Sequence, residues 1–169
     1  VHPIGAVTKN TEGKELAEMY DMKKSGAIAF GDGINCIQSS GLLVKALQYV
    51  KAFEGLIIQI PDDKSINAFG LMHEGIVSTT IGLPGKPSMA EELIVARDIK
   101  LTRYAESKLH FTGVASKKSL EYIQRGKESG INLSCSVTPY HLFFCDDDLK
   151  DYDANLKVNP PIRSAEDRN

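Results

Sequence analysis

The 169-residue sequence has no tryptophan, only three cysteines and no long apolar run. Cys36, Cys135 and Cys145 are odd in number and form no C-x-x-C pair, which argues against a disulfide framework and against a zinc ribbon. Such cysteines suit a reducing compartment, so we expect a cytoplasmic protein. No apolar stretch approaches the roughly 20 residues of a membrane span, and the first residues, VHPIGAVTK, lack the layout of a signal peptide.

An excess of one charge is also missing. The formal net charge is −2, the pI is about 6.1, and the basic residues are scattered. Proteins that bind nucleic acid or anionic membranes usually present a basic patch, so we expect neither partner. What is present is a hydrophobic content of 42%, which is enough for one compact domain with a sizeable core.

Strand-like runs alternate with helix-like runs along the chain. The pattern predicts five strands, at 2–8, 27–32, 56–62, 109–116 and 131–139, and four intervening helices, at 13–26, 39–55, 88–108 and 117–130. The central strands are almost continuously apolar, as in parallel strands covered on both faces. Right-handed βαβ crossovers then give either a doubly wound sheet or an arc of a (β/α)8 barrel. The Gly- and Ser-rich stretch 63–87 is expected to be a functional or poorly ordered loop.

Several motifs favour ordinary structural interpretations. GLPGKPS (82–88) lacks the spacing of a phosphate-binding loop and indicates a turn. The acidic run DDDLKDYDANLK (146–157) has Leu where a calcium loop needs Gly, which favours a solvated loop or a helix N-terminus. Ser116, Ser134 and Ser136 lie in no G-x-S-x-G elbow, and nothing marks a cysteine as an activated thiol. We therefore assign no catalytic residue.

The stretch KLHFTGVAS (108–116) raises the question of a metal site, because it predicts a strand that carries His110. A lone histidine on a strand is more often a hydrogen-bonded structural residue than a ligand. A metal site therefore requires partners elsewhere in the chain.

Four phrases resemble the middle of dihydroorotases, within the metal-dependent amidohydrolase superfamily. They cover almost the whole chain and read HPIGAVTKNTEGKELAEM, GLMHEGIVSTTIGLPGKPSMAEELIVARDIKL, VTPYHLFF and LKVNPPIRSAEDR. The resemblance implies a TIM-type (β/α)8 barrel that, in active members, uses zinc to hydrolyse the cyclic amide of dihydroorotate in pyrimidine biosynthesis. It also implies that residues 1–169 are the central βα segment of that barrel, with an H-x-H motif before Val1 and a catalytic Asp after Asn169.

The resemblance places three metal positions within the sequence. FGDG matches an S/T-D-D-G phrase, so Asp32 stands at a metal-contacting position while Gly33 replaces the second Asp. IIQIPDD matches V-x-H-x-E-[DE], which puts Ile60 where a ligand histidine belongs. HFTGVAS matches H-x-x-H-V-S-T, so His110 matches the first histidine and Gly113 occupies the ligand position. Catalytic zinc typically takes three protein ligands, and neither isoleucine nor glycine can supply one from its side chain.

Several further residues can be compared with the family pattern, and some depart from it while others match it. Tyr140 replaces the first histidine of T-P-H-H-L while His141 is retained, and Ser136, after Cys135, replaces a more usual Glu. Asn159 in NPPIR matches a substrate-contacting residue, although Asn before Pro is also a good turn and cap residue. Asp32 could likewise cap the helix that follows it. His73 in MHEG matches the family as a loop feature, and a structural role is favoured for it.

These departures predict a dihydroorotase-like protein whose metal site is lost and whose barrel acts as a scaffold, with no cofactor in this segment. Inactive members of the family imply aspartate carbamoyltransferase as a partner. An isolated barrel arc exposes two sheet edges, so we expect a homo-oligomer or a flatter sheet covered on both faces. In an open monomer the strand residues expected to face solvent are Ile28, Phe30, Ile58 and Ile60. The alternative is an active zinc-dependent dihydroorotase that takes ligands from outside the segment or from Asp62 and Asp63.

Overall fold

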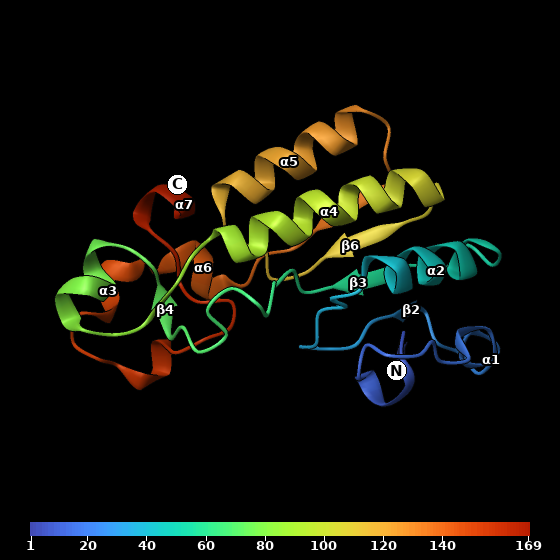
Figure 1. Cartoon of the computed structure of the whole chain (residues 1–169), viewed down its shortest axis with the longest axis horizontal. Helices are drawn as coiled ribbons and strands as arrows, with labels where there is room; N and C mark the ends of the chain where they lie inside the picture. Colours follow the sequence, from blue (N-terminus) through green and yellow to red (C-terminus); the bar gives the residue numbers. More distant parts are fainter.

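The computed structural model describes residues 1–169 and contains a five-stranded parallel sheet (Figure 1). Its strands are β1 (Ile4–Gly5), β2 (Ala29–Phe30), β3 (Ile57–Gln59), β6 (Leu109–Phe111) and β7 (Leu133–Cys135), paired in the order β1-β2-β3-β6-β7. A doubly wound sheet reverses its strand order at a switch point. The order here never reverses, which is the arrangement of a (β/α)8 barrel arc. The five predicted strands are confirmed, and of the two architectures the sequence left open, the barrel arc is the one observed.

Four helices connect these strands: α1 (Met19–Lys24), α2 (Ser40–Lys51), α4 (Met89–Ala105) and α5 (Lys117–Glu128). Helix α2 packs against α4, and α4 against α5, along one face of the sheet (Figure 1). In α2 the buried residues recur at helical spacing, as Leu43, Ala46, Leu47 and Val50. None of the helices combines the length and the apolar character that a membrane crossing requires.

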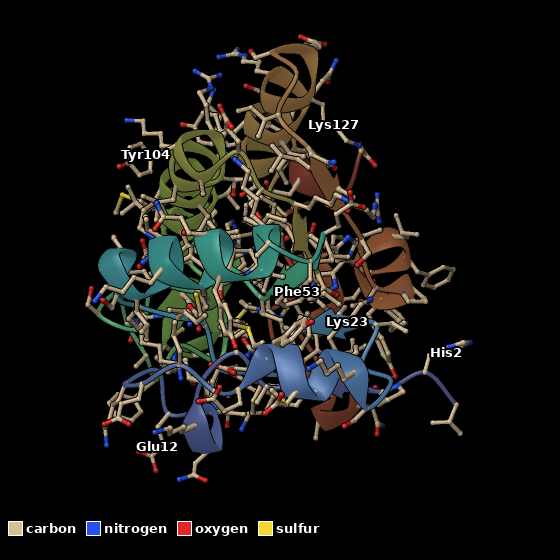
Figure 2. The ribbon with its side chains drawn as sticks, turned by 90° about the vertical axis from the view of Figure 1, so that its right-hand side faces the viewer. His2, Glu12, Lys23, Phe53, Tyr104 and Lys127 are labelled. Carbon is tan, nitrogen blue, oxygen red and sulfur yellow. The ribbon has the colours of Figure 1, made fainter.

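The main core lies between the sheet and these helices. Phe30 pairs with Ile57, Ile57 with Leu109, and Leu109 with Leu133, so one apolar row crosses four strands. Phe53, just beyond α2, lies between α2 and α1 in Figure 2, with its ring centroid 5.8 Å from that of Phe30. The side chains of this row lie under the helices and are buried in the main core.

The opposite face of the sheet carries no helix. Ile58, His110 and Ser134 are in register on it, and they are half-buried, half-buried and exposed. The expectation of a doubly covered sheet is therefore wrong for this chain. The expectation of solvent-facing strand residues holds for Ile28, which is 51% exposed, but fails for Phe30, which is 0% exposed because it points into the helix-covered row. Ile60 is half-buried.

Residues 63–87 form a small second lobe instead of a loop. They contain the parallel strands β4 (Met72–His73) and β5 (Gly85–Lys86) and the helix α3 (Ile76–Ile81), at the left of Figure 1. The turns η2 (Asp146–Leu149) and η3 (Ala154–Leu156) join this lobe. A separate small core holds it together, made of Met72, Leu149, Leu156 and Ile162.

Two predicted elements are shorter than expected. The helix predicted at 13–26 begins only at Met19, because Leu16 instead forms an antiparallel bridge with Thr8 and the Ala17 N–H donates to the Val7 carbonyl. The strand predicted at 131–139 ends at Cys135, and Pro139 opens the helix α6 (Pro139–Phe143). The remaining elements are η1 (Lys9–Thr11) and α7 (Ala165–Arg168).

Candidate functional site

The carboxyl ends of the strands define the candidate site, because barrel enzymes build their active sites from the loops that follow these ends. Asp32 follows β2, Ile60 follows β3 and Gly113 follows β6. These three strands are neighbours in the sheet, so the fold brings the three positions to one edge.

The Asp32 carboxylate is already bound by the loop that follows β1. Its Oδ1 accepts the N–H groups of Val7 at 2.9 Å and Thr8 at 3.0 Å, and its Oδ2 accepts the Thr8 hydroxyl. Asp32 and Thr8 are both buried. The expectation that Asp32 caps the following helix is wrong, since Ser39 caps α2 by accepting the Leu42 N–H. The carboxylate thus secures the turn after β1.

The carboxylates in the segment after β3 are also occupied by structural contacts. Ile60 offers no ligand atom. The Asp62 carboxylate forms an ion pair with Lys86 Nζ at 2.6 Å, and both side chains are largely buried. The Asp63 carboxylate accepts the Ser65 N–H and hydroxyl at 2.9 and 2.6 Å, and these hydrogen bonds hold the pKa of Asp63 below its usual range.

The backbone of Gly113 has a conformation that glycine adopts easily and other residues rarely adopt. Its φ is +71°, in the left-handed region that favours glycine, and it is buried. A Cβ at this position would lie 3.2 Å from Cδ of Pro160 in the NPPIR phrase. A histidine here would meet both an unfavourable backbone and a crowded neighbour.

His110 binds two serines of the adjacent strand. Its Nδ1 lies 2.8 Å from Ser134 Oγ and its Nε2 lies 3.0 Å from Ser136 Oγ. The Ser136 hydroxyl also lies 3.0 Å from Thr112 Oγ1. Partial burial lowers the pKa of His110 below its ordinary value. His110 therefore has no free nitrogen for a metal while these contacts persist.

The other predicted site residues have separate surroundings. His141 is buried, with Nδ1 2.7 Å from the Thr138 hydroxyl and Nε2 3.0 Å from the Pro160 carbonyl. Because a carbonyl only accepts, Nε2 carries the proton and Nδ1 accepts from Thr138. Tyr140 and Asn159 are exposed. His73 lies on β4 in the second lobe, where burial lowers its pKa.

Catalytic zinc does not fit the residues present at these strand ends. Of the three positions that the family resemblance predicts for metal ligands, two lack a donor side chain and the third, Asp32, is bound by three hydrogen bonds. One group of three potential ligands occurs in the chain, Cys145, Asp146 and Asp147, and it lies at the start of η2 in the second lobe. Its exposed Asp147 carboxylate pairs with Lys150 at 2.7 Å.

Two buried polar networks behind this edge were not predicted. In the first, the Glu91 carboxylate accepts the N–H groups of Ala115 and Ser116, and Arg163 donates to the Lys86 carbonyl at 2.8 Å. This network joins the GLPGKPSMAEE and NPPIR phrases. Their side chains are far apart in the sequence, so no local pattern announces the contact.

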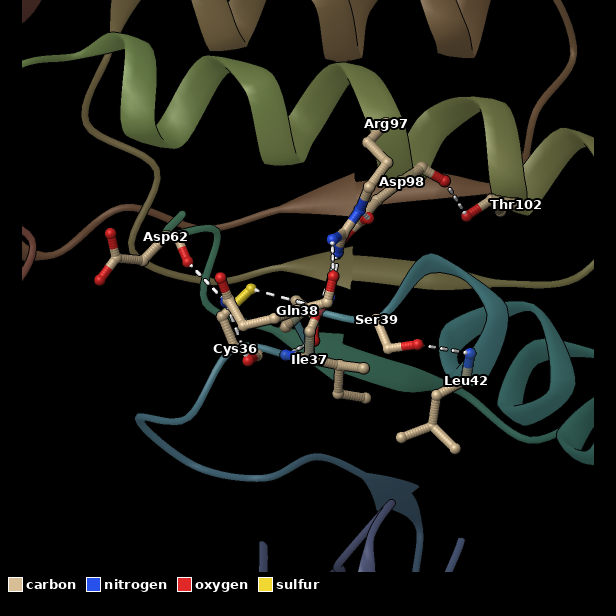
Figure 3. Close-up of polar contacts among 10 residues, drawn as sticks. Cys36, Ile37, Gln38, Ser39, Leu42, Asp62, Arg97, Asp98 and Thr102 are labelled. Atoms are coloured by element: carbon tan, nitrogen blue, oxygen red, sulfur yellow. Dashed lines mark hydrogen bonds and ion pairs between the residues drawn. The ribbon is translucent and has the colours of Figure 1, made fainter. Parts of the chain in front are cut away.

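The second network fixes the segment between β2 and α2 (Figure 3). Arg97 on α4 donates to the carbonyls of Ile37 and Gln38 at 2.7 and 2.6 Å and pairs with Asp98 at 2.7 Å. Gln59 at the end of β3 donates to Asp98 at 2.7 Å. The polar Gln59 within an apolar strand was the one sequence signal of this network.

Comparison with solved structures defines the fold class of the protein. The L-hydantoinase (dihydropyrimidinase) of Arthrobacter aurescens matches 99% of this chain, and 38% of its own chain, with a TM-score of 0.79 and 22% identity. A D-hydantoinase (dihydropyrimidinase) from Thermus sp. matches 98% of this chain, and 37% of its own, with a TM-score of 0.72 and 12% identity. The chain thus has the fold of part of these hydantoinase barrels, with the strand order of a (β/α)8 barrel arc.

Sequence comparison identifies the family within this class. The family model described as "Dihydro-orotase-like" matches residues 1–119. The dihydroorotases of Pelotomaculum thermopropionicum and Leifsonia xyli subsp. xyli are 44% identical over 167 residues and 43% identical over 169 residues. The chain belongs to the dihydroorotase-like family. It covers 39% of the length of each of these two relatives.

Proposed function

We propose that the protein is a dihydroorotase-like component of pyrimidine biosynthesis that has lost zinc-dependent catalysis and acts as a scaffold. The observation that carries the proposal is the state of the three ligand positions. Ile60 and Gly113 provide no donor atom, and Asp32 is held by the backbone of the first βα unit.

The geometry around Gly113 supports a change in the local backbone of the site as well as the loss of a ligand residue. The left-handed backbone and the Pro160 contact suit glycine and disfavour histidine. The alternative, an active zinc-dependent dihydroorotase, would need ligands from outside residues 1–169, because Asp62 and Asp63 are bound to Lys86 and Ser65.

The scaffold role extends to a partner. We propose that the barrel associates with aspartate carbamoyltransferase and with further copies of itself. The resemblance to inactive family members supports the first partner. The helix-free face with exposed Ser134 and half-buried Ile58 is consistent with a surface that other polypeptide covers.

Metal content and activity of the full-length protein test the catalytic part of the proposal. Elemental analysis should find no stoichiometric zinc, and ring opening of dihydroorotate should stay at background. The dihydroorotase of Pelotomaculum thermopropionicum, assayed in parallel, is the positive control. Stoichiometric zinc together with turnover would overturn the loss of catalysis.

The scaffold part has its own test. Size-exclusion chromatography with light scattering, on the full-length protein alone and mixed with aspartate carbamoyltransferase from the same organism, should show self-association and a joint complex. A monomer that leaves the elution of the carbamoyltransferase unchanged would contradict it.

A further inference from the structure

The second lobe is a unit with a core of its own. It combines residues 63–87 with residues 146–162, which lie together at the left of Figure 1. The Tyr152 hydroxyl, in the second segment, donates to the Ile81 carbonyl of the first at 2.6 Å. The core of the lobe has four buried residues, whereas the main core has 18. Because regions that bury little apolar surface open more readily, we expect the lobe to be less stable than the sheet.

A neck of polar contacts connects the lobe to the barrel. At the base of the first segment, the Asp63 N–H donates to the Ala90 carbonyl at 2.9 Å, so the chain enters and leaves this segment at one point. At the base of the second segment, the Asp146 N–H donates to the Arg163 carbonyl at 2.9 Å, with the same effect. The Arg163 guanidinium joins the two bases by donating to the Lys86 carbonyl at 2.8 Å. Such a neck allows the lobe to turn as one body while its internal contacts stay intact.

One buried ion pair lies at this neck. Lys86 Nζ, on β5 of the lobe, is 2.6 Å from the carboxylate of Asp62, which follows β3, and the two side chains are 8% and 17% exposed. Removing one partner of a buried pair leaves an uncompensated charge, whereas removing both partners costs far less. The closed position of the lobe therefore requires either both charges or neither.

The closed lobe lies against the ends of β3 and β6. Asp62 follows β3, and Gly113, which follows β6, is so close to Pro160 that a Cβ on the glycine would lie 3.2 Å from Pro160 Cδ. The Pro160 carbonyl also accepts a hydrogen bond from His141 Nε2 at 3.0 Å. This edge of the sheet is where barrel proteins carry their sites.

We propose that the second lobe opens as one body about this neck, and that the Asp62–Lys86 ion pair is the latch that holds it closed over the ends of β3 and β6. Each contact of the neck joins two residues within 1–169, so the latch does not depend on what covers the inner face of the sheet. It is also independent of zinc and of the proposed scaffold role. Opening uncovers the carboxyl edge of the sheet without unfolding the barrel.

Hydrogen exchange of the full-length wild-type protein, followed by mass spectrometry, tests whether the lobe is one unit. Peptides from 66–84 and 147–158 should share one opening equilibrium and should exchange faster than the peptides that contain β3 and β6. Two different opening equilibria, or a lobe that exchanges no faster than the sheet, would overturn the proposal.

Variants of the ion pair test the latch. Lys86→Met keeps an apolar side chain of similar length but leaves the Asp62 carboxylate without its partner. It should speed the exchange of both lobe segments about 100-fold and leave the exchange of α2 unchanged. The double variant Asp62→Asn/Lys86→Met removes both charges and should recover most of the lost protection. A lysine that stabilised the lobe only by packing would show no such recovery.

The matched control is Lys14→Met, which breaks the exposed ion pair with Glu12 and should exchange like the wild type. The comparison of the two segments in the wild-type protein keeps the test decisive if Lys86→Met misfolds. Unchanged lobe exchange in folded Lys86→Met, or a double variant that is no better protected than Lys86→Met, would show that the ion pair is not the latch.

Discussion

Replacing Gly113 with histidine would introduce the ligand residue that the family resemblance predicts at this position, and we expect it to destabilise the protein without creating a zinc site. Gly113 has φ +71°. A residue with a Cβ in this region costs about 1–2 kcal/mol relative to glycine. Loss of unfolded-chain freedom offsets about 0.4–1 kcal/mol of this.

The contact with Pro160 adds a second term. The new Cβ would lie 3.2 Å from Pro160 Cδ, which is tighter than most real Cβ contacts, and the imidazole beyond it must also find space in a buried position. Overpacking of this kind costs about 1–3 kcal/mol, so we expect a total loss of about 2–4 kcal/mol. A typical domain has only about 5–15 kcal/mol of net stability.

Urea denaturation of the wild type, Gly113→His and Gly130→His measures the two terms separately. Gly130 also has a positive φ, +79°, but no atom lies within 4 Å of its Cβ position, so its replacement reports the backbone term alone. Gly113→His should lose clearly more stability than this control. Equal stability of Gly113→His and wild type, with stoichiometric zinc bound, would refute the reasoning.

Three further perturbations follow from buried polar groups. Asp32→Asn should lower the free energy of unfolding by about 1–3 kcal/mol, because an amide cannot accept all three hydrogen bonds, and urea denaturation checks this. Arg97→Ala should cost about 3 kcal/mol or more by leaving the Asp98 carboxylate buried without its ion partner, whereas the exposed Arg103→Ala should stay within about 0.5 kcal/mol. Burial lowers the pKa of His141, so the unfolded chain takes up the proton first as the pH falls below 6.5. Stability should therefore drop between pH 7.5 and 5.5, and His141→Gln should make that slope shallower; an unchanged slope would contradict the assignment.

The sequence was sufficient to predict the main helices and all five strands of the sheet. Leu43, Leu47 and Val50 recur at helical spacing, and the predicted helices at 39–55 and 88–108 correspond to α2 and α4. These features depend on residues close together in the chain, which is why periodicity reveals them. The family resemblance added the barrel, and the strand order agrees with it.

Local pattern failed where distant segments decide the conformation. The segment from Gly13 to Ala17 has helix-forming residues, yet it pairs with Val7 and Thr8, just beyond the end of β1. The lobe at 63–87 contains two-residue strands that pair only with each other. Its core is completed by Leu149 and Ile162, which lie far away in the sequence. Neither contact leaves a periodic signal.

The features of the candidate site also divide into those that the sequence determines and those that only the tertiary structure decides. Residue identity alone determined that Ile60 and Gly113 cannot ligate a metal through their side chains, because that is a property of the side chain itself. Only the tertiary structure decided what the remaining groups do: it bound Asp32 to the backbone after β1 and placed His110 between Ser134 and Ser136. The physical reason is register, since a one-residue shift between β6 and β7 would turn the serines to the other face of the sheet.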